Sequence, residues 1–298
     1  MNELFLDIIK RLSKYDINMK ENYQFYRNLQ NKIPLSKKSK TIIEENFIFH
    51  LFSPKQEQTK KAIIYLHGGG WAAGSVKFYS STLQRLANEC KRNVIAFDYP
   101  LAPEHPFPEG FNYCYKAIKT IFQKGMNYHI DTSEIIIMGD SAGANLATAI
   151  CLKAKQTKDF KIKKEILLYP IVQTNFKENK KYPSIEKNGY DYFLNKNMID
   201  DYLTMYLPNK KDYKNKYVAP LYAKNLFGMP ETLIITADLD PLKDEGYAYA
   251  QKLKRYFNKV TYYNIKDVIH GFFNNPLYFK ENHYVIKKIK RFVGDQFE

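Results

Sequence analysis

The stretch IIIMGDSAGANLATA spans residues 135–149 and joins an apolar run to a run of helix-forming residues. This order predicts a strand, a sharp turn and a helix, with Ser141 at the turn. Gly139 and Gly143 are expected there because a side chain at either position would clash with the neighbouring strand or helix. A GxSxG pattern alone is weak evidence, but the flanking strand and helix indicate a strained serine with an exposed hydroxyl.

The length and the apolar pattern predict one α/β domain. With 298 residues, of which 45% are hydrophobic, the chain can bury a large core, so we expect a single domain over residues 1–298 with insertions. From about residue 42 onward, apolar runs alternate with amphipathic stretches, which is typical of a mostly parallel sheet flanked by helices. The expected strands are 42–52, 62–66, 94–99, 135–138, 165–169, 232–236 and 260–265. The expected helices are 79–90, 111–124, 141–155, 197–206, 243–257 and 278–292. Residues 1–40 and about 173–229 break the alternation, and long insertions of this kind are often functional lids.

The basic charge of the chain does not by itself indicate a nucleic-acid partner. The formal net charge is +15, but only six of the 46 basic residues are arginines, and the lysines are spread along the chain. Arginine is the residue that bidentate recognition of phosphates and bases prefers. We therefore expect no nucleic-acid partner and interpret the lysine runs as solvated faces.

The cysteines and the apolar runs favour a cytoplasmic protein. Cys90, Cys114 and Cys151 form no CxxC pattern, so we expect buried free thiols in a reducing compartment. No apolar run approaches the ~20 residues of a membrane span, and charged residues interrupt residues 1–20, so we expect neither a transmembrane helix nor a signal peptide. Apolar residues between positions 4 and 12 recur at helical spacing, which predicts a helix on the protein's own surface, with a membrane-surface anchor as the alternative.

A reactive serine needs a base, and chain order selects one histidine. In a strand-turn-helix arrangement of this type the acid and then the base follow the serine, each at the carboxyl end of a later strand. Only His270 and His283 lie beyond the last expected strand. We interpret His283 as an exposed helical residue, whereas His270 lies in a loop directly before Gly271. His270 is therefore the predicted base.

The predicted acid lies after the strand at 232–236. Asp240 is best placed because Pro241 can begin a helix directly behind it. Asp238 is the second candidate, and Asp267, three residues before His270, is a third that we interpret as surface charge. Asp244 and Glu245 are better explained as first-turn residues stabilised by the helix dipole.

A glycine-rich segment can supply donors for the oxyanion that forms when a serine attacks a carbonyl. His67-Gly68-Gly69-Gly70-Trp71 follows the strand at 62–66, and glycines allow backbone N–H groups to approach a ligand closely. Ala142, directly after the serine, supplies another N–H at the start of its helix. We expect His67 to hold this loop by hydrogen bonds, with support from Gly68. A phosphate loop is the alternative, but no GxxxxGK[ST] or GxGxxG pattern is present, and no metal or cofactor motif is found either.

Taken together, the motifs resemble the hormone-sensitive-lipase-like (GDXG) family of α/β-hydrolase esterases. The matching motifs, in order, are HGGGW at 67–71, DYPLAPEHPFP at 98–108, GDSAGANLA at 139–147, DLDPLKDEG at 238–246 and HGF at 270–272. The resemblance runs from about residue 42 to the end. Pro100 departs from it, because this family commonly has an arginine there, which affects local loop contacts and not the triad.

The resemblance implies a fold, a set of site residues and an activity. It implies an α/β-hydrolase fold, Ser141 as nucleophile, Asp240 as acid and His270 as base. It further implies an oxyanion hole formed by the N–H groups of Gly69, Gly70 and Ala142. It also implies a helical cap, which determines substrate preference in this family, from residues 1–40 and about 173–213.

We expect a serine carboxylesterase that hydrolyses short-chain acyl or acetyl esters through an acyl-enzyme intermediate. Its partner would be a small-molecule ester, and a homodimer is compatible with the sequence. The alternative is an amidase or formamidase similar to kynurenine formamidase, with the same triad and an HGG-type loop. A non-catalytic receptor similar to the gibberellin receptors is less favoured, because all three triad residues are present.

Overall fold

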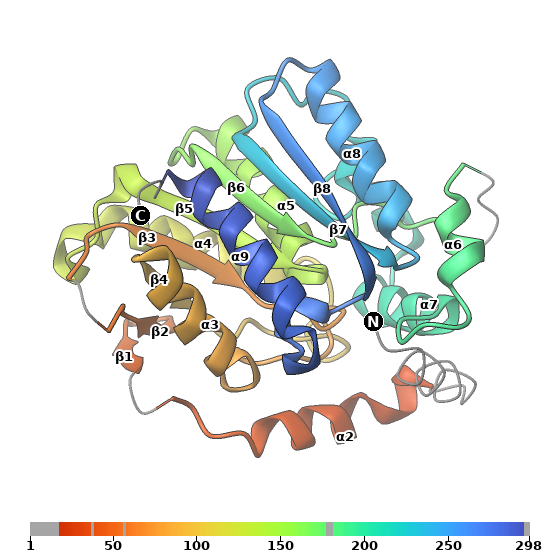
Figure 1. The fold of residues 1–298 in the computed structure, drawn as a ribbon, viewed down its shortest axis with the longest axis horizontal. Coiled ribbons are helices and arrows are strands. Elements are labelled where there is room, and N and C mark those ends of the chain that lie inside the picture. Colours follow the sequence, from red (N-terminus) through yellow and green to blue (C-terminus); the bar gives the residue numbers. More distant parts are fainter. Residues whose placement is uncertain (1–17, 37–38, 56–57, 177–180, 295–298) are drawn as a thin grey trace.

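The structure is a computed structural model that describes residues 18–36, 39–55, 58–176 and 181–294 (Figure 1). The amphipathic stretch expected at residues 4–12 lies outside these ranges, as do four residues of the segment 173–213.

Within the described ranges, eight strands form one sheet. The strands are β1 (Ser39–Ile43), β2 (Ile48–Phe52), β3 (Ala62–Leu66), β4 (Asn93–Ala96), β5 (Ile135–Asp140), β6 (Lys164–Leu168), β7 (Glu231–Leu239) and β8 (Val260–Ile269). Their order is β1-β2-β4-β3-β5-β6-β7-β8, with β3 to β8 parallel and the first two strands antiparallel. Parallel strands end at the same edge of a sheet, so the segments that follow β3, β5, β7 and β8 come together there. The predicted mostly parallel sheet is confirmed.

The single strand expected at residues 42–52 is wrong. Residues 39–52 form a hairpin in which β1 pairs with β2, and the backbone N–H of Glu44 donates to the carbonyl of Phe47 at the turn. The turn contains neither glycine nor proline, and apolar residues lie on both sides of it, so the sequence pattern reads as one continuous strand.

Helices cover both faces of the sheet. The helices are α2 (Met19–Asn31), α3 (Val76–Cys90), α4 (Glu109–Lys124), α5 (Ala142–Thr157), α6 (Pro183–Asn188), α7 (Lys196–Tyr206), α8 (Lys243–Arg255) and α9 (Phe279–Val293). Buried residues of α3 and α9 share a core with one face of the sheet, and buried residues of α4, α5 and α8 share a core with the other.

Strand β3 shows why the sheet is buried on both faces. Ile64 and Leu66 belong to the core beneath α4 and α5, whereas Ile63 and Tyr65 belong to the core beneath α3 and α9. Successive side chains of a strand point to opposite faces, so an uninterrupted apolar run fits only a strand that is covered on both sides. The three cysteines are free and buried within these layers, as predicted.

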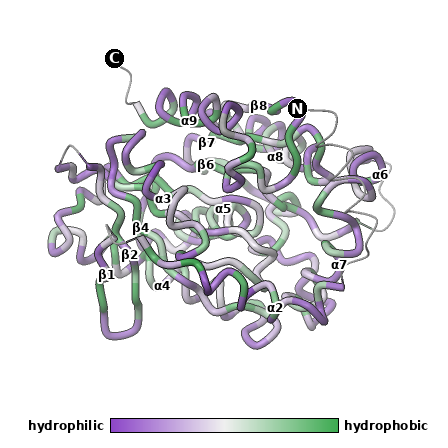
Figure 2. Tube along the Cα trace, turned by 60° about the horizontal axis from the view of Figure 1, so that its bottom comes forward, coloured by the Kyte–Doolittle hydropathy of each residue, from purple (hydrophilic) through white to green (hydrophobic). Residues whose placement is uncertain are grey.

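The two segments outside the sheet pattern lie together in space. Helix α2 contacts α7 (Figure 2), and both lie toward the carboxyl ends of the strands (Figure 1). Asn18 caps the start of α2 by accepting a hydrogen bond from the backbone N–H of Glu21. In the described part of the chain, no helix is long and apolar enough to cross a membrane.

Candidate active site

The turn between β5 and α5 has the geometry that its sequence predicts. Ser141 has a φ of 53°, a positive value that non-glycine residues rarely adopt. A Cβ atom at Gly139 would lie 2.4 Å from the carbonyl oxygen of Gly143, and one at Gly143 would lie 2.1 Å from the carbonyl oxygen of Leu66. Only glycine fits at these two positions, because the start of α5 and the end of β3 approach the turn so closely.

Ser141, His270 and Asp240 lie in one hydrogen-bonded line. The Nε2 atom of His270 is 2.8 Å from Oγ of Ser141, and its Nδ1 atom is 2.7 Å from Oδ2 of Asp240. The other oxygen of Asp240 accepts from the backbone N–H of Leu242 at 2.8 Å. Asp240 is fully buried and His270 is 8% exposed. The carboxylate is thus fixed and oriented toward the ring, and the ring toward the serine.

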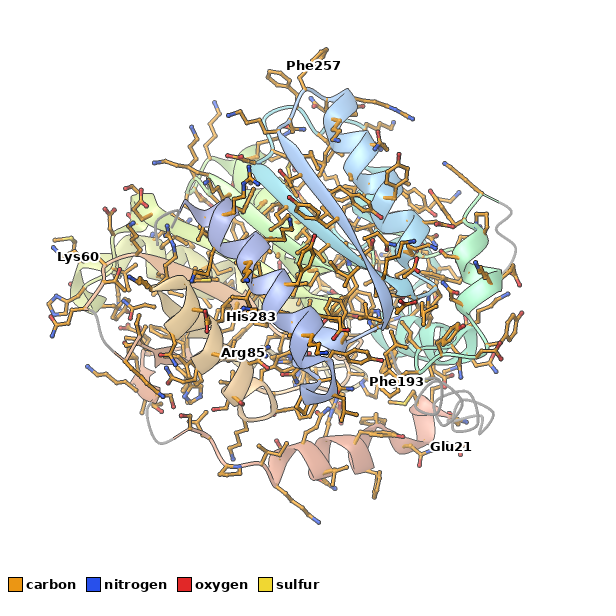
Figure 3. The ribbon with its side chains drawn as sticks, viewed as in Figure 1. Glu21, Lys60, Arg85, Phe193, Phe257 and His283 are labelled. Atoms are coloured by element: carbon orange, nitrogen blue, oxygen red, sulfur yellow. The ribbon has the colours of Figure 1, made fainter. Side chains whose placement is uncertain are left out.

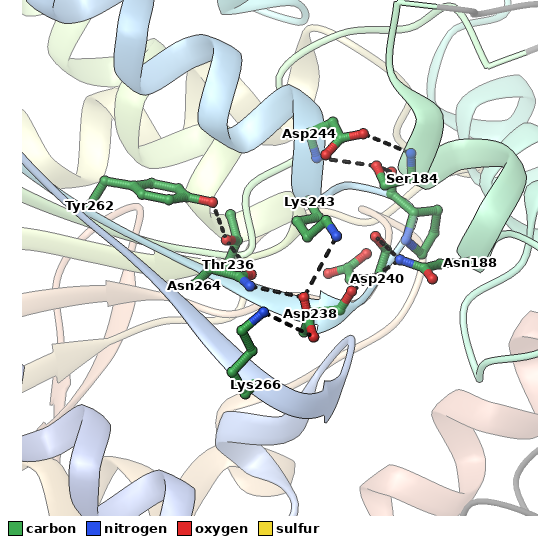
Figure 4. Close-up of polar contacts among 11 residues, drawn as sticks. Ser184, Asn188, Thr236, Asp238, Asp240, Lys243, Asp244, Tyr262, Asn264 and Lys266 are labelled. Carbon is green, nitrogen blue, oxygen red and sulfur yellow. Dashed lines mark hydrogen bonds and ion pairs between the residues drawn. The ribbon is translucent and has the colours of Figure 1, made fainter.

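The competing carboxylates lie elsewhere. The carboxylate of Asp238 is held by Asn264, Lys243 and Lys266 (Figure 4), whereas the carboxylate bonded to His270 is that of Asp240. Burial works to raise the pKa of Asp238, but the hydrogen bond from Asn264 and the two lysine charges outweigh it, so this pKa is lowered. Asp267 is exposed on β8.

Helix α6 supports the segment that carries the aspartates. The side-chain amide of Asn188 donates to the backbone carbonyls of Asp238 and Asp240, at 3.0 and 3.2 Å (Figure 4). Ser184 donates through Oγ to the carbonyl of Pro241, and its backbone N–H donates to the carboxylate of Asp244. The chain between β7 and α8 is therefore held from the insertion as well as from the sheet.

The second candidate histidine is not part of this site. His283 is exposed on α9, on the outer surface of the molecule (Figure 3), as its helical pattern predicts.

The glycine-rich loop after β3 lies beside Ser141. Gly69, Gly70 and Ala142 all line the same cavity as the serine. Their backbone N–H groups donate to no residue that the structure describes. His67 stacks on Tyr99 with 4.4 Å between ring centroids, and its Nδ1 lies 2.9 Å from the carbonyl oxygen of Gly68. Three residues whose backbone N–H groups have no partner among the described residues thus line the cavity that contains Ser141.

Asp140 is a site residue for which the sequence predicted no role. Its carboxylate accepts hydrogen bonds from the hydroxyls of Tyr65 and Tyr79 and from the backbone N–H of Gly68, at 2.8 to 2.9 Å. Burial raises the pKa of this carboxyl, although the three hydrogen bonds act in the opposite direction. Because Asp140 directly precedes Ser141, it links the serine turn to the glycine loop. Its position within GDSAG was the only available signal.

A cavity of about 410 Å³ opens in front of the serine. Helices α2 and α7 contribute mostly apolar side chains to its wall, including Met19, Tyr26, Met198 and Tyr202. Of the 46 basic residues in the chain, no lysine or arginine lines the part of this cavity that the structure describes. Among the described residues, no group of three or more histidine, cysteine, aspartate or glutamate side chains could hold a metal ion.

Comparison of the chain with known proteins identifies its family. A family model described as the alpha/beta hydrolase fold matches residues 63–274, which include all of the motifs above. The chain belongs to the α/β-hydrolase-fold family. The resemblance predicted from the sequence motifs is thereby confirmed.

Relatives of this α/β hydrolase carry esterase and deacetylase names. An arylesterase of Saccharolobus solfataricus is 31% identical over 227 residues, which cover 76% of this chain and 72% of that protein. Arylacetamide deacetylase of Mus musculus is 28% identical, with 86% of this chain and 80% of that protein covered.

Solved structures extend the similarity to nearly the whole hydrolase. The structure of an arylesterase has a TM-score of 0.84 at 28% identity and covers 99% of this chain, with 98% of its own chain covered. A hyperthermophilic esterase from the archaeon Pyrobaculum calidifontis has a TM-score of 0.86 at 26% identity, with the same coverage.

Proposed function

We propose that this α/β hydrolase is a serine carboxylesterase with Ser141 as nucleophile, His270 as base and Asp240 as acid. The observation that carries the proposal is the continuous hydrogen-bonded line from Asp240 through His270 to Ser141. A serine hydroxyl needs such a base, and the base needs a carboxylate to hold it in the productive tautomer.

The proposed reaction has two halves. With its Nδ1–H donated to Asp240, His270 accepts the hydroxyl proton of Ser141 at Nε2, and the serine oxygen attacks the ester carbonyl. The tetrahedral intermediate collapses as His270 returns that proton to the leaving alcohol, which leaves an acyl-enzyme. Water then loses a proton to His270 and attacks the acyl group, and the proton passes back to Ser141 as the acid is released.

The negative oxygen of each intermediate needs donors that are already in place. We assign this role to the N–H groups of Gly69, Gly70 and Ala142, which line the cavity beside Ser141. Fixed donors in a sheltered site stabilise developing charge strongly, because they need not reorganise during the reaction. His67 and Gly68 support the loop that carries two of these donors.

The proposed substrate is a small, uncharged ester. The cavity volume of about 410 Å³ lies toward the lower end of the roughly 300–1,000 Å³ that is usual for small-molecule sites. Helices α2 and α7 would act as the cap that closes it. A series of 4-nitrophenyl esters with acyl chains of two to sixteen carbons tests this, and kcat/KM should be highest at the short end. A maximum at the long end would contradict the assignment.

The test of the nucleophile is Ser141→Ala. We expect its turnover of 4-nitrophenyl acetate to fall by about 10⁴-fold or more, since the loss of a triad member typically costs that much. A fluorophosphonate probe should label the wild-type protein and leave Ser141→Ala unlabelled. Wild-type turnover by the alanine variant would end the proposal.

Amide cleavage is the second candidate, and one observation favours it. A relative covering 86% of this chain is named arylacetamide deacetylase. Triad geometry serves both bonds, so only rates can separate them. Phenyl acetate and acetanilide differ only in the scissile bond, and a kcat/KM for acetanilide equal to or above that for phenyl acetate would favour the amidase.

A further inference from the structure

A single arginine of α2 joins two loops next to the cavity. Nε of Arg27 donates to the backbone carbonyl of Ala72 at 2.7 Å, and Nη2 donates to the carbonyl of Ala102 at 2.6 Å. The remaining terminal nitrogen contacts Glu104 at 2.9 Å. The Arg27 side chain is 19% exposed, whereas Glu104 is 44% exposed. The hydrogen bonds from Arg27 to the carbonyls of Ala72 and Ala102 are therefore shielded from solvent more than its contact with Glu104.

The first of these carbonyls belongs to the turn that carries Gly69 and Gly70. The backbone N–H groups of Ala72 and Ala73 both donate to the carbonyl of Gly69, so residues 69–73 form one tight turn. The N–H of Ala102 donates to the carbonyl of Trp71 at 2.8 Å. Arg27 thus bonds to the turn directly through Ala72 and indirectly through Ala102.

One helical turn further along α2, a second side chain contacts the same loop. Oε1 of Gln30 accepts from the backbone N–H of Gly74 at 2.8 Å. Residues three apart on a helix share a face, so Arg27 and Gln30 act on the loop together. The loop is confined from its other side too, because a Cβ at Gly74 would lie 2.3 Å from the carbonyl oxygen of Gly68.

Lysine could not replace this arginine. A guanidinium presents several N–H groups in a fixed plane and can bond two separate carbonyls at once, whereas an ammonium group is a compact point charge on a flexible stem. The spacing of the two carbonyls and the plane of the guanidinium together define the position of the turn.

We propose that Arg27 is a positioning residue that holds the turn 69–74 so that the N–H groups of Gly69 and Gly70 face the substrate oxygen. The oxyanion hole is then complete only when α2 is docked. This role rests on the proposed esterase function, because it acts through the donors assigned there.

The first test separates kcat from KM. Arg27→Met keeps the length of the side chain and removes its donors. Removal of an oxyanion donor costs about 10²–10³-fold, so a displaced turn should lower kcat for 4-nitrophenyl acetate by about tenfold or more, with KM changed less than about threefold. Arg27→Lys should restore little of this loss.

The matched control lies on the same helix. Lys20 forms an ion pair with Asp201 of α7 at 3.2 Å and, among the described residues, has no hydrogen bond or ion pair to either loop. Lys20→Met should leave kcat within about twofold of the wild type, since exposed ion pairs contribute little. A raised KM with unchanged kcat in Arg27→Met, or an equal fall in kcat in Lys20→Met, would overturn the proposal.

The second test does not depend on activity. Amide hydrogen exchange of a peptide covering residues 68–76 should be at least about tenfold faster in Arg27→Met than in the wild type, with peptides from β5 and β6 unchanged as the control for folding. Equal exchange rates would overturn the proposal. A wild-type protein without Ser141-dependent hydrolysis would instead end the proposed esterase function, and exchange would then show whether Arg27 holds the turn.

Discussion

The carboxylate of Asp140 accepts a hydrogen bond from the backbone N–H of Gly68 at 2.9 Å, across 72 residues of sequence. Two tyrosine hydroxyls bond the same carboxylate. The residue before the nucleophile is therefore a fixed point for the loop that faces it.

Asp140→Ala should destabilise the fold as well as lower activity. Removing the carboxylate leaves the hydroxyls of Tyr65 and Tyr79 buried without their acceptor, and each buried unsatisfied group costs about 1–3 kcal/mol. We expect the free energy of unfolding in urea to fall by about 2–4 kcal/mol. Asp140→Asn keeps an acceptor oxygen and should lose less. Equal stabilities of the alanine variant and the wild type would contradict the role of this carboxylate.

The choice between the two aspartates after β7 is open to a direct comparison. Asp240→Asn should lower kcat by about 10⁴-fold, because the amide cannot hold His270 in the tautomer that accepts a proton from Ser141. Asp238→Asn should change kcat less than about threefold, since its carboxylate is paired with two lysines and an asparagine, whereas His270 is bonded to Asp240. The reverse order of effects would move the acid to Asp238.

Substrate charge should matter, because no lysine or arginine lines the described part of the cavity. We expect kcat/KM for 4-acetoxybenzoate to be at least about tenfold below that for its methyl ester, since an unpaired charge is costly to bury. Both esters release a similar phenol, which isolates the effect of charge.

Introducing a lysine into the cavity tests the same effect of charge by adding a cation. Phe193 lines the cavity, whereas Phe257 is 89% exposed at the far end of the molecule (Figure 3). Phe193→Lys should narrow the gap between the two esters, and Phe257→Lys should leave it unchanged. Equal effects of the two lysines would indicate long-range attraction by the net charge of +15 instead of a local contact.

The ionisation of one buried glutamate, Glu245, should make the free energy of unfolding fall as the pH rises. Burial raises the pKa of Glu245 from 4.5 to about 8, although hydrogen bonds from the backbone of Val172 and from Gln173 oppose the shift. A carboxyl with a raised folded-state pKa stabilises the fold fully below its unfolded pKa and loses that contribution as the pH rises to the folded value.

The test compares the free energy of unfolding of the wild type and of Glu245→Gln as a function of pH. Glu245→Gln cannot titrate, so the free energy of unfolding of the wild type should fall relative to that of the variant between pH 5 and 8, by up to about 1.4 kcal/mol per pH unit. Other buried carboxyls, such as Glu165 with a pKa of about 7, titrate in both proteins and cancel. Parallel curves would contradict the assigned shift.

The hydrogen-bonded set of Ser141, His270 and Asp240 could be predicted from the sequence because local patterns identify each residue. Each of the three residues follows a recognisable strand, and a parallel sheet brings those strand ends to one edge. Gly139 and Gly143 could be predicted in the same way, since the close contacts of the turn leave no space for a side chain at either position. The hairpin at 39–52 could not be predicted, because strand pairing decides it and its turn contains neither glycine nor proline.

The contacts of Arg27 and Asp140 were not predictable for a related reason. Their partners lie 45 to 77 residues away, and no local pattern encodes such a distance. One signal was present in the composition. In a chain with forty lysines, Arg27, Arg85 and Arg92 each donate to backbone carbonyls of distant segments, which a lysine could not do in the same planar geometry.

The contacts of α6 with the end of β7 bear on how such enzymes can be recombined. Asn188 and Ser184 belong to the insertion, yet they hold the backbone that presents Asp240. A chimera that receives this insertion from a relative would also inherit a different support for its acid. The insertion therefore cannot be exchanged independently of the catalytic acid. A chimera that keeps Asn188 and Ser184 should retain turnover, and a chimera that replaces them should lose it.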